Sequence, residues 1–131
     1  AGHRGCYQSY LGGAALALRA REAGLHVSPA ELVDLWRAGD PRATAIMRDA
    51  QDALAALCRL LVTLLDPELI VIAGGVALAT PELVETARRA VDPHPLTEAA
   101  GPVPVQLAQL GEDAGLLGAA LVARDAAEAR G

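Results

Sequence analysis

The feature that most constrains this fold is a pair of short β-rich runs, 69–73 and 103–107, with one helical pattern between them. The first run has no polar alternation, which is typical of a parallel strand covered on both faces. Two such strands joined through a helix form one right-handed βαβ unit. A two-stranded sheet is not independently stable, so we expect residues 1–131 to be the C-terminal portion of a larger α/β domain. Its other strands then come from upstream polypeptide or from another chain.

Helical spacing predicts the elements around these strands. We expect helices over 7–11, 14–23, 29–38, 41–65, 81–91 and 114–129. The coarse order of the longer elements is α-α-α-β-α-β-α, which is an α/β fold. The helix over 41–65 is the longest, and its apolar stripe runs from Ile46 to Leu64 and Leu65. Because proline has no N–H to donate to a neighbouring strand, Pro104 must lie at the start of the second strand, or that strand must be at the edge of the sheet.

Capping residues precede most of these helices. Ser28 and Glu31 form the pattern of a capping box, and Asp40 and Thr80 stand at N-cap positions followed by proline. The adjacent carboxylates Glu112–Asp113 precede the last helix, where they would favour the positive end of its dipole. We therefore interpret these polar side chains as structural.

Composition excludes several functional classes. The 131 residues carry a net charge of −5 with a pI near 5.1, whereas nucleic-acid binding needs a basic surface. The uncharged stretches are shorter than the roughly 20 residues that a membrane helix requires. No basic segment followed by an apolar one occurs in residues 1–20, so we expect no secretory signal and a cytoplasmic location.

Few residues are candidates for chemistry. Gly74–Gly75 ends the first strand, and ligands of parallel sheets bind beyond that end, although a glycine pair in this position more often forms a plain turn. A Walker-type phosphate lysine is excluded because the chain has no lysine.

The cysteines and histidines do not form a complete site. Cys6 lies near His3 in a loop flanked by glycines, and this pair supplies one thiol and one imidazole, which is fewer ligands than a metal site needs. Cys58 lies on the apolar stripe of the long helix and is expected in the core. His26 and His94 are expected at the surface.

Four segments together carry a family resemblance. They are GHRGCYQSY at 2–10, GDPRA at 39–43, LLDPELIVIAGGV at 64–76 and LGEDAGLLGAA at 110–120. In this order they resemble the C-terminal part of the ROK family, the group of sugar-responsive repressors and sugar kinases. The resemblance implies an actin/hexokinase-like (ribonuclease H-like) fold, with two α/β domains around a sugar and nucleotide cleft. Residues 1–131 would then be a C-terminal fragment of the second α/β domain.

The resemblance also implies roles for individual residues. The family signature C-x-C-G-x-x-G-C-x-E builds a zinc knuckle, in which Cys6 matches the last cysteine ligand and Ala1 falls where another cysteine is usual. Gln8 falls at the glutamate that helps to hold the sugar, and a carboxamide cannot accept as a carboxylate does. Gly74 and Gly75 match the nucleotide-side turn of the kinase members, and Ala73 stands where a third glycine is frequent.

These departures favour a regulator over a kinase. The leading hypothesis is the effector-sensing and dimerising part of a ROK-type transcriptional regulator, which responds to a sugar or sugar derivative and contacts DNA only through a winged helix outside this chain. The alternative is a C-terminal fragment of an ATP-dependent ROK sugar kinase, and a third is a structural module without a ligand. The catalytic aspartate and the first phosphate loop of the kinases match nothing within residues 1–131, so this stretch by itself is not expected to be an enzyme.

The hypotheses differ in the cofactors and partners that they imply. Zinc is expected only in the intact protein because the knuckle is incomplete here, and ATP is expected only for a kinase. A sugar is the expected small-molecule partner, a homo-oligomer is the expected assembly, and no membrane is involved. The free chain is also expected to self-associate, because its sheet edge and apolar helix faces lack cover.

Overall fold

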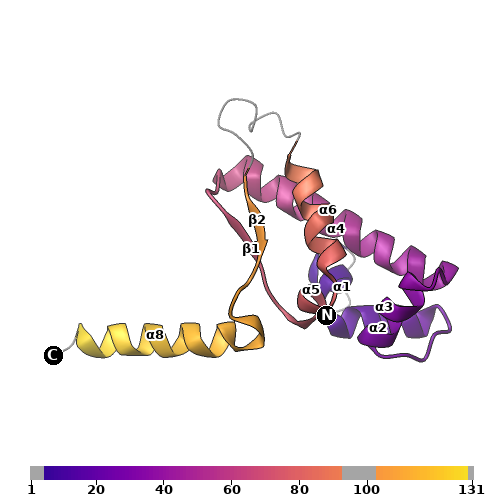
Figure 1. Ribbon diagram of the computed structural model, residues 1–131, viewed down its shortest axis with the longest axis horizontal. Helices are drawn as coiled ribbons and strands as arrows, with labels where there is room; N and C mark the ends of the chain where they lie inside the picture. Colours follow the sequence, from indigo (N-terminus) through magenta and orange to yellow (C-terminus); the bar gives the residue numbers. More distant parts are fainter. Residues whose placement is uncertain (1–4, 93–102, 130–131) are drawn as a thin grey trace.

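The chain is described by a computed structural model for residues 5–92 and 103–129 (Figure 1). The elements in chain order are α1 (Gln8–Leu11), α2 (Gly13–Glu22), α3 (Pro29–Arg37), α4 (Pro41–Leu65), β1 (Ile70–Ile72), α5 (Gly75–Ala79), α6 (Pro81–Val91), β2 (Val105–Leu107), the 3₁₀ turn η1 (Gly111–Asp113) and α8 (Ala114–Glu128). In the described ranges, no helix combines the length and apolarity needed to cross a bilayer. The expected helices all form, with ends that move by at most one residue.

The predicted parallel pair of strands is confirmed. β1 and β2 form a two-stranded parallel sheet within the described residues, in the register Ile70 with Val105 and Ile72 with Leu107. Pro104 lies directly before β2, where its carbonyl accepts from the Ile70 amide at 2.9 Å and its missing N–H costs nothing. Each strand is three residues long and therefore shorter than the run that predicted it.

The core is built around α4, the long helix that runs along the upper right of the body in Figure 1. Helices α1, α2, α3 and α6 contact α4, and the buried apolar side chains come mainly from α2, α3, α4, α6 and the two strands. Fully buried large side chains include Leu16, Leu32, Met47, Val62, Val91 and Val105. Cys58 is buried on α4 as expected, but Leu64 and Leu65, which we placed on the buried stripe, are 69% and 68% exposed. These two leucines are not buried because the last turn of α4 extends beyond the elements that cover the rest of the helix.

The local capping predictions hold at α3 and α4. Ser28 N–H donates to Glu31 Oε2 at 2.8 Å and Glu31 N–H donates to Ser28 Oγ at 3.3 Å, which completes the capping box. The Asp40 carboxylate accepts from the amides of Arg42 and Ala43 at 2.9 and 3.0 Å. These bonds hold the pKa of Glu31, mainly through the Ser28 amide, and of Asp40, mainly through the Ala43 amide, below their ordinary values.

Two other capping predictions are wrong. The Thr80 side chain makes no cap bond at α6, because it is turned into the interior and is fully buried. The Asp113 side chain makes no cap bond at α8, since η1 precedes that helix without a break and Asp113 itself has helical dihedral angles. His26 is exposed as expected, whereas His94 lies outside the described residues.

The short helix α5 was not predicted. The sequence analysis placed only a turn at Gly74–Gly75, but Gly75 already begins a helix that runs to Ala79. Five apolar residues after a strand carry too little periodicity to reveal a helix of little more than one turn. Among the described residues between the two strands, α5 is thus a helix that the sequence did not predict.

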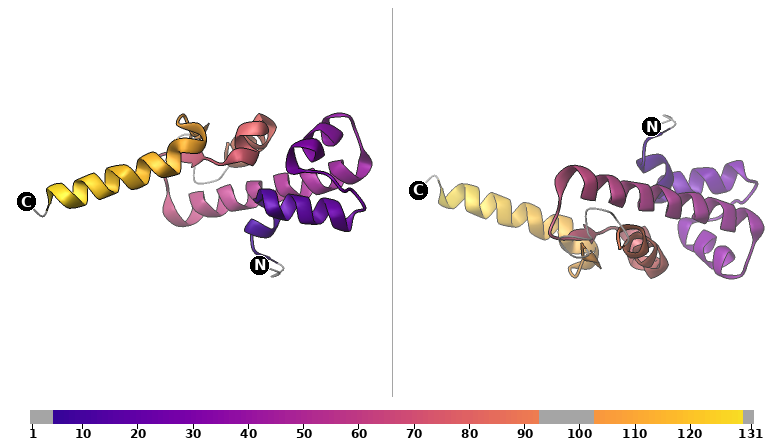
Figure 2. Two further views of the ribbon diagram at one scale, coloured as in Figure 1. Left: turned by 90° about the horizontal axis from the view of Figure 1, so that it is seen from below. Right: turned by 90° about the horizontal axis from the view of Figure 1, so that it is seen from above.

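The last helix, α8, leaves the body of the molecule. Figures 1 and 2 show it extending away from the other helices, and none of its residues is buried. Its main contacts run to η1, the turn directly before it. Among the residues that the structure describes, α8 therefore has little tertiary cover.

Candidate functional site

An apolar hollow lies along β1 and includes the turn that follows it. Its volume is about 430 Å³, and it is lined by the strand, by the Gly74–Gly75 turn, by α4 and by the junction of α1 and α2. The lining residues are Leu11, Gly12, Gly13, Leu54, Leu57, Cys58, Leu61, Ile70, Val71, Ile72, Ala73, Gly74, Gly75, Val76, Ala77 and Leu83. None of these side chains is charged. The hollow is thus suited to an apolar or aromatic group at the carboxyl end of a parallel strand.

Two glycine pairs meet at this hollow. Gly74 has φ 105° and ψ 157°, a region that is essentially restricted to glycine, so the sharp turn out of β1 depends on it. Gly12–Gly13 joins α1 to α2, and a Cβ on Gly13 would lie 3.5 Å from Val76 Cγ2. The start of α2 therefore packs closely against α5, which brings the two pairs together. In the sequence, Gly12–Gly13 only separates the helices expected over 7–11 and 14–23, and no spacing pointed to this contact.

Gln8 lies outside this hollow. It is the exposed first residue of α1 and lines a separate hollow of about 220 Å³ together with Ser9 and Leu18. The structure thus brings Gly74 and Gly75 into one cavity, as expected of adjacent residues, but does not bring Gln8 into it. A ligand that reaches both Gln8 and the turn would have to extend across α1.

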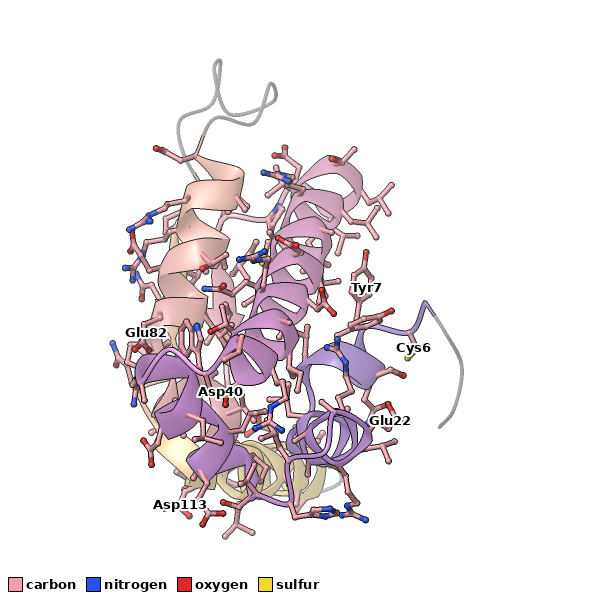
Figure 3. All side chains as sticks on the ribbon, turned by 90° about the vertical axis from the view of Figure 1, so that its right-hand side faces the viewer. Cys6, Tyr7, Glu22, Asp40, Glu82 and Asp113 are labelled. Atoms are coloured by element: carbon pink, nitrogen blue, oxygen red, sulfur yellow. The ribbon has the colours of Figure 1, made fainter. Side chains whose placement is uncertain are left out.

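Cys6 is exposed at the edge of the molecule, next to Tyr7, while Glu82 lies at the opposite edge (Figure 3). Within residues 5–92 and 103–129, no group of three or more His, Cys, Asp or Glu side chains could hold a metal ion. His3 and Ala1 lie outside the described residues. The described residues therefore supply one thiol toward the expected zinc knuckle and do not form a metal site.

A polar hollow of about 420 Å³ beside Cys6 was missed by the sequence analysis. Tyr7, Tyr10, Asp49 and Asp52 line it together with Gly5 and Ala53. Arg19 organises one wall: its guanidinium lies 5.2 Å from the centroid of the Tyr10 ring and forms an ion pair with Asp49. Thirty residues separate Arg19 from Asp49, and no local pattern could have revealed this pairing.

Comparison with curated proteins connects this arrangement to sugar kinases. The chain is 31% identical to an N-acetyl-D-glucosamine kinase of Yersinia pseudotuberculosis over 122 residues, which is 92% of this chain and 40% of that protein. It is 33% identical to an N-acetylmannosamine kinase of Yersinia pestis over 123 residues, which is 94% of this chain and 41% of that protein. The chain thus spans about two fifths of the length of these relatives.

Solved structures give the same result and support the expected fold. A ROK hexokinase from Thermus thermophilus superposes with a TM-score of 0.73 at 34% identity, over 91% of this chain and 40% of that one. A ROK glucokinase from Streptomyces griseus, solved with glucose and AMPPNP, gives a TM-score of 0.75 at 26% identity, over 95% of this chain and 46% of that one. The sequence profile of the ROK family matches residues 1–126. With its α/β architecture of the actin/hexokinase-like type, the chain belongs to the ROK family.

Proposed function

We propose that this chain is the C-terminal part of the second α/β domain of a ROK sugar kinase, in which the turn at Gly74–Gly75 faces the nucleotide. The observation that carries the proposal is the position of this turn, directly after the carboxyl end of β1 and among the residues that line the apolar hollow. Nucleotide ligands of open parallel sheets bind outside such strand ends. The named relatives and structural neighbours given above are sugar kinases, which supports a kinase over a regulator.

The residues present fit one part of ATP better than another. The hollow is walled by Leu54, Leu61 and Val76 and carries no charge, so it suits the purine base, and the Gly74 backbone can approach a ligand without steric hindrance from a Cβ. Triphosphate binding needs cations or many amides, and no Arg or Lys lines the hollow. We infer that the phosphate-binding loop and the catalytic base come from polypeptide outside these residues, as the resemblance implies.

A transcriptional regulator is the second candidate, and Gln8 favours it. A neutral carboxamide in place of the family's glutamate accepts a weaker hydrogen bond from a sugar hydroxyl than a carboxylate does, which suits an effector that must be released. In this case the chain is the sugar-sensing and dimerising part, and DNA is contacted only by a separate winged helix. Zinc in the intact protein and a homo-oligomeric assembly are expected for either candidate.

A phosphoryl-transfer assay separates the two candidates. The intact protein is incubated with ATP and, in turn, with hexoses and N-acetylhexosamines, and sugar phosphate is measured. A kinase gives turnover with at least one sugar. A regulator binds a sugar by calorimetry but gives no sugar phosphate above the protein-free control, and that result would exclude the kinase proposal.

A matched pair of glycine variants tests the role of the turn. Gly74→Ala and Gly39→Ala both place a Cβ on a residue with positive φ and open space around it, but Gly39 lies at the junction of α3 and α4, away from the hollow. If the Gly74 turn approaches the nucleotide, Gly74→Ala weakens binding of a non-hydrolysable ATP analogue at least about tenfold, a loss near 1.4 kcal/mol. Gly39→Ala leaves that affinity unchanged. Equal affinities of the two variants would remove the turn from the nucleotide site.

A further inference from the structure

The helix α1 is a single turn whose orientation depends on its neighbours. It consists of Gln8–Leu11, has no fully buried side chain, and begins without a side-chain cap bond. A helix this short is not stable by itself, because forming the first turn of a helix is unfavourable. α1 contacts α2 and α4. The side chains that make these contacts therefore determine how the turn is oriented.

Arg19 on α2 joins α1 to α4. Its guanidinium lies 5.2 Å from the centroid of the Tyr10 ring on α1 and forms an ion pair with Asp49 on α4. Its Nη1 also donates to the carbonyl of Ile46 at 3.4 Å. The Arg19 side chain is only 21% exposed, and a cation over an aromatic ring is held more strongly when water is partly excluded. One guanidinium thus links three helices.

Tyr10 and Gln8 face opposite sides of α1. Two residues that are separated by one position in an α-helix point about 200° apart. The cavities agree with this direction: Tyr10 lines the polar hollow beside Cys6, whereas Gln8 lines the separate hollow that contains Leu18, and the two hollows share no lining residue. The contact that holds the Tyr10 ring therefore also fixes the direction in which Gln8 points.

We propose that Arg19 is a positioning residue, which fixes the rotation of α1 through the Tyr10 ring and thereby directs Gln8 toward the sugar. Arg19 itself lines neither the hollow of Gln8 nor the apolar hollow beside the glycine turn. It acts on the ligand only through α1. This inference rests on the proposed sugar-binding function, for a kinase and a regulator alike, in which Gln8 contacts a sugar hydroxyl.

A double-mutant cycle with Gln8 tests the proposal in the intact protein. Affinities for glucose, N-acetyl-D-glucosamine and N-acetylmannosamine are measured by calorimetry, and the sugar that binds most tightly is used for the variants. We expect Gln8→Ala and Arg19→Ala each to weaken binding about fivefold, as for the loss of one hydrogen bond. In the Gln8→Ala background, Arg19→Ala should add less than about a twofold loss, because its effect passes through Gln8. An equal loss in both backgrounds would overturn the proposal.

Arg59→Ala is the matched control variant. The Arg59 guanidinium also joins two helices, since its Nε on α4 donates to the carbonyl of Ala90 on α6 at 3.0 Å. Glu82 of α6 and Tyr7, the residue before α1, lie on opposite sides of the molecule (Figure 3). Arg59→Ala should therefore lower the midpoint of urea unfolding and leave the sugar affinity unchanged. A loss of affinity equal to that of Arg19→Ala would contradict a specific role of Arg19.

Hydrogen exchange in α1 gives a readout that needs no sugar. The amides of Tyr10, Leu11 and Gly12 donate to carbonyls within the turn at 2.9, 3.0 and 3.3 Å. They should exchange at least about tenfold faster in Arg19→Ala than in the wild type, and at the wild-type rate in Arg59→Ala. Unchanged exchange in Arg19→Ala overturns the proposal.

The two readouts separate failure of the proposal from failure of the proposed function. If the wild type binds none of the three sugars, the proposed function is wrong, and the exchange rates decide whether Arg19 holds α1. If Arg19→Ala does not fold, Tyr10→Leu takes its place, because it removes the ring below the guanidinium and keeps an apolar side chain. The same losses are expected for it, and wild-type affinity together with wild-type exchange would overturn the proposal.

Discussion

Arg37 on α3 and Glu82 on α6 form a two-pronged ion pair, with Nε 2.9 Å from Oε1 and Nη2 3.0 Å from Oε2. The same Nη2 donates to the carbonyl of Ala79 at 3.1 Å. One guanidinium therefore joins α3 to the start of α6 and to the end of α5, the helix that follows the glycine turn. The pair raises the pKa of Arg37 and lowers the pKa of Glu82, mainly through their mutual hydrogen bonds.

Removing either partner is expected to lower stability slightly, because both side chains are more than two fifths exposed and water screens the pair. Arg37→Ala and Glu82→Gln should each lower the midpoint of urea unfolding, and the double variant should lose less than the sum. Full additivity would show that the two side chains do not interact in solution.

The same pair predicts a pH dependence with a definite sign. The pKa of Glu82 is lower in the folded chain than its ordinary value of 4.5, so the folded state binds fewer protons. The stabilisation is complete above that ordinary value and disappears as the pH falls through the folded pKa. The stability difference between the wild type and Glu82→Gln should therefore shrink between pH 6 and pH 3, measured by urea unfolding at each pH. A difference that is constant over this range would contradict the pair.

Local patterns predicted the elements that depend on neighbouring residues. The capping box at Ser28 and Glu31, the Asp40 cap and the strand start beside Pro104 require contacts only a few residues apart, and all of them form. The pairing of Arg19 with Asp49 and the approach of Gly12–Gly13 to the Gly74 turn depend on tertiary packing. No period or spacing encodes such contacts.

The family resemblance predicted roles for individual residues, which the local patterns did not, but it did not predict the geometry of the site. Its assignment of Gly74 and Gly75 to a nucleotide-side turn stays a prediction, and it could not show that Gln8 lies outside the hollow that this turn lines. The error at Thr80 has a simple cause. A threonine before a proline matches the pattern of an N-cap whether its hydroxyl faces the helix or the core.

Loss of the capping box should cost measurable stability. Ser28→Ala removes the acceptor for the Glu31 amide at the start of α3, and an N-cap substitution of this kind costs about 1 kcal/mol. Ser28→Asp keeps an acceptor at the same place and serves as the control. Urea unfolding monitored by far-UV circular dichroism measures both, and equal stabilities of the Ala and Asp variants would argue against the cap.

Replacing the buried hydroxyl of Thr80 should stabilise the chain. Its side chain is fully buried, and its hydroxyl has no hydrogen-bond partner among the residues that the structure describes. Burying a hydroxyl without a partner costs about 1–3 kcal/mol, and valine has the same shape without this cost. Thr80→Val should therefore raise the free energy of unfolding by roughly 1 kcal/mol, whereas Thr80→Ser should lower it by opening a methyl-sized void. A destabilised Thr80→Val would mean that the hydroxyl is bonded.

The two cysteines should react at very different rates. Cys58 is 1% exposed among apolar side chains, and burial raises the pKa of its thiol, while Cys6 is exposed. At pH 8 a thiol reagent should therefore modify one thiol per chain rapidly and the second only in denaturant. Cys6→Ser should abolish the rapid phase and Cys58→Ala should leave it intact. Two rapid thiols in the wild type would contradict the packing of α4.

The free 131-residue chain should self-associate, because two apolar surfaces are uncovered. One is α8, with Leu116 and Val122, and the other is the end of α4, with Leu64 and Leu65, all at least 68% exposed. Sedimentation velocity over a range of concentrations should show a distribution that shifts to larger species as the concentration rises.

Two double variants identify the surface that drives association. One carries Leu116→Glu and Val122→Glu, and the other carries Leu64→Glu and Leu65→Glu, which places the same charge on the other surface. Burial of one leucine side chain contributes about 1.5–3 kcal/mol, so the double variant that changes the contacting surface should weaken association by tenfold or more. A wild-type chain that stays monomeric at every concentration would show that neither surface drives association.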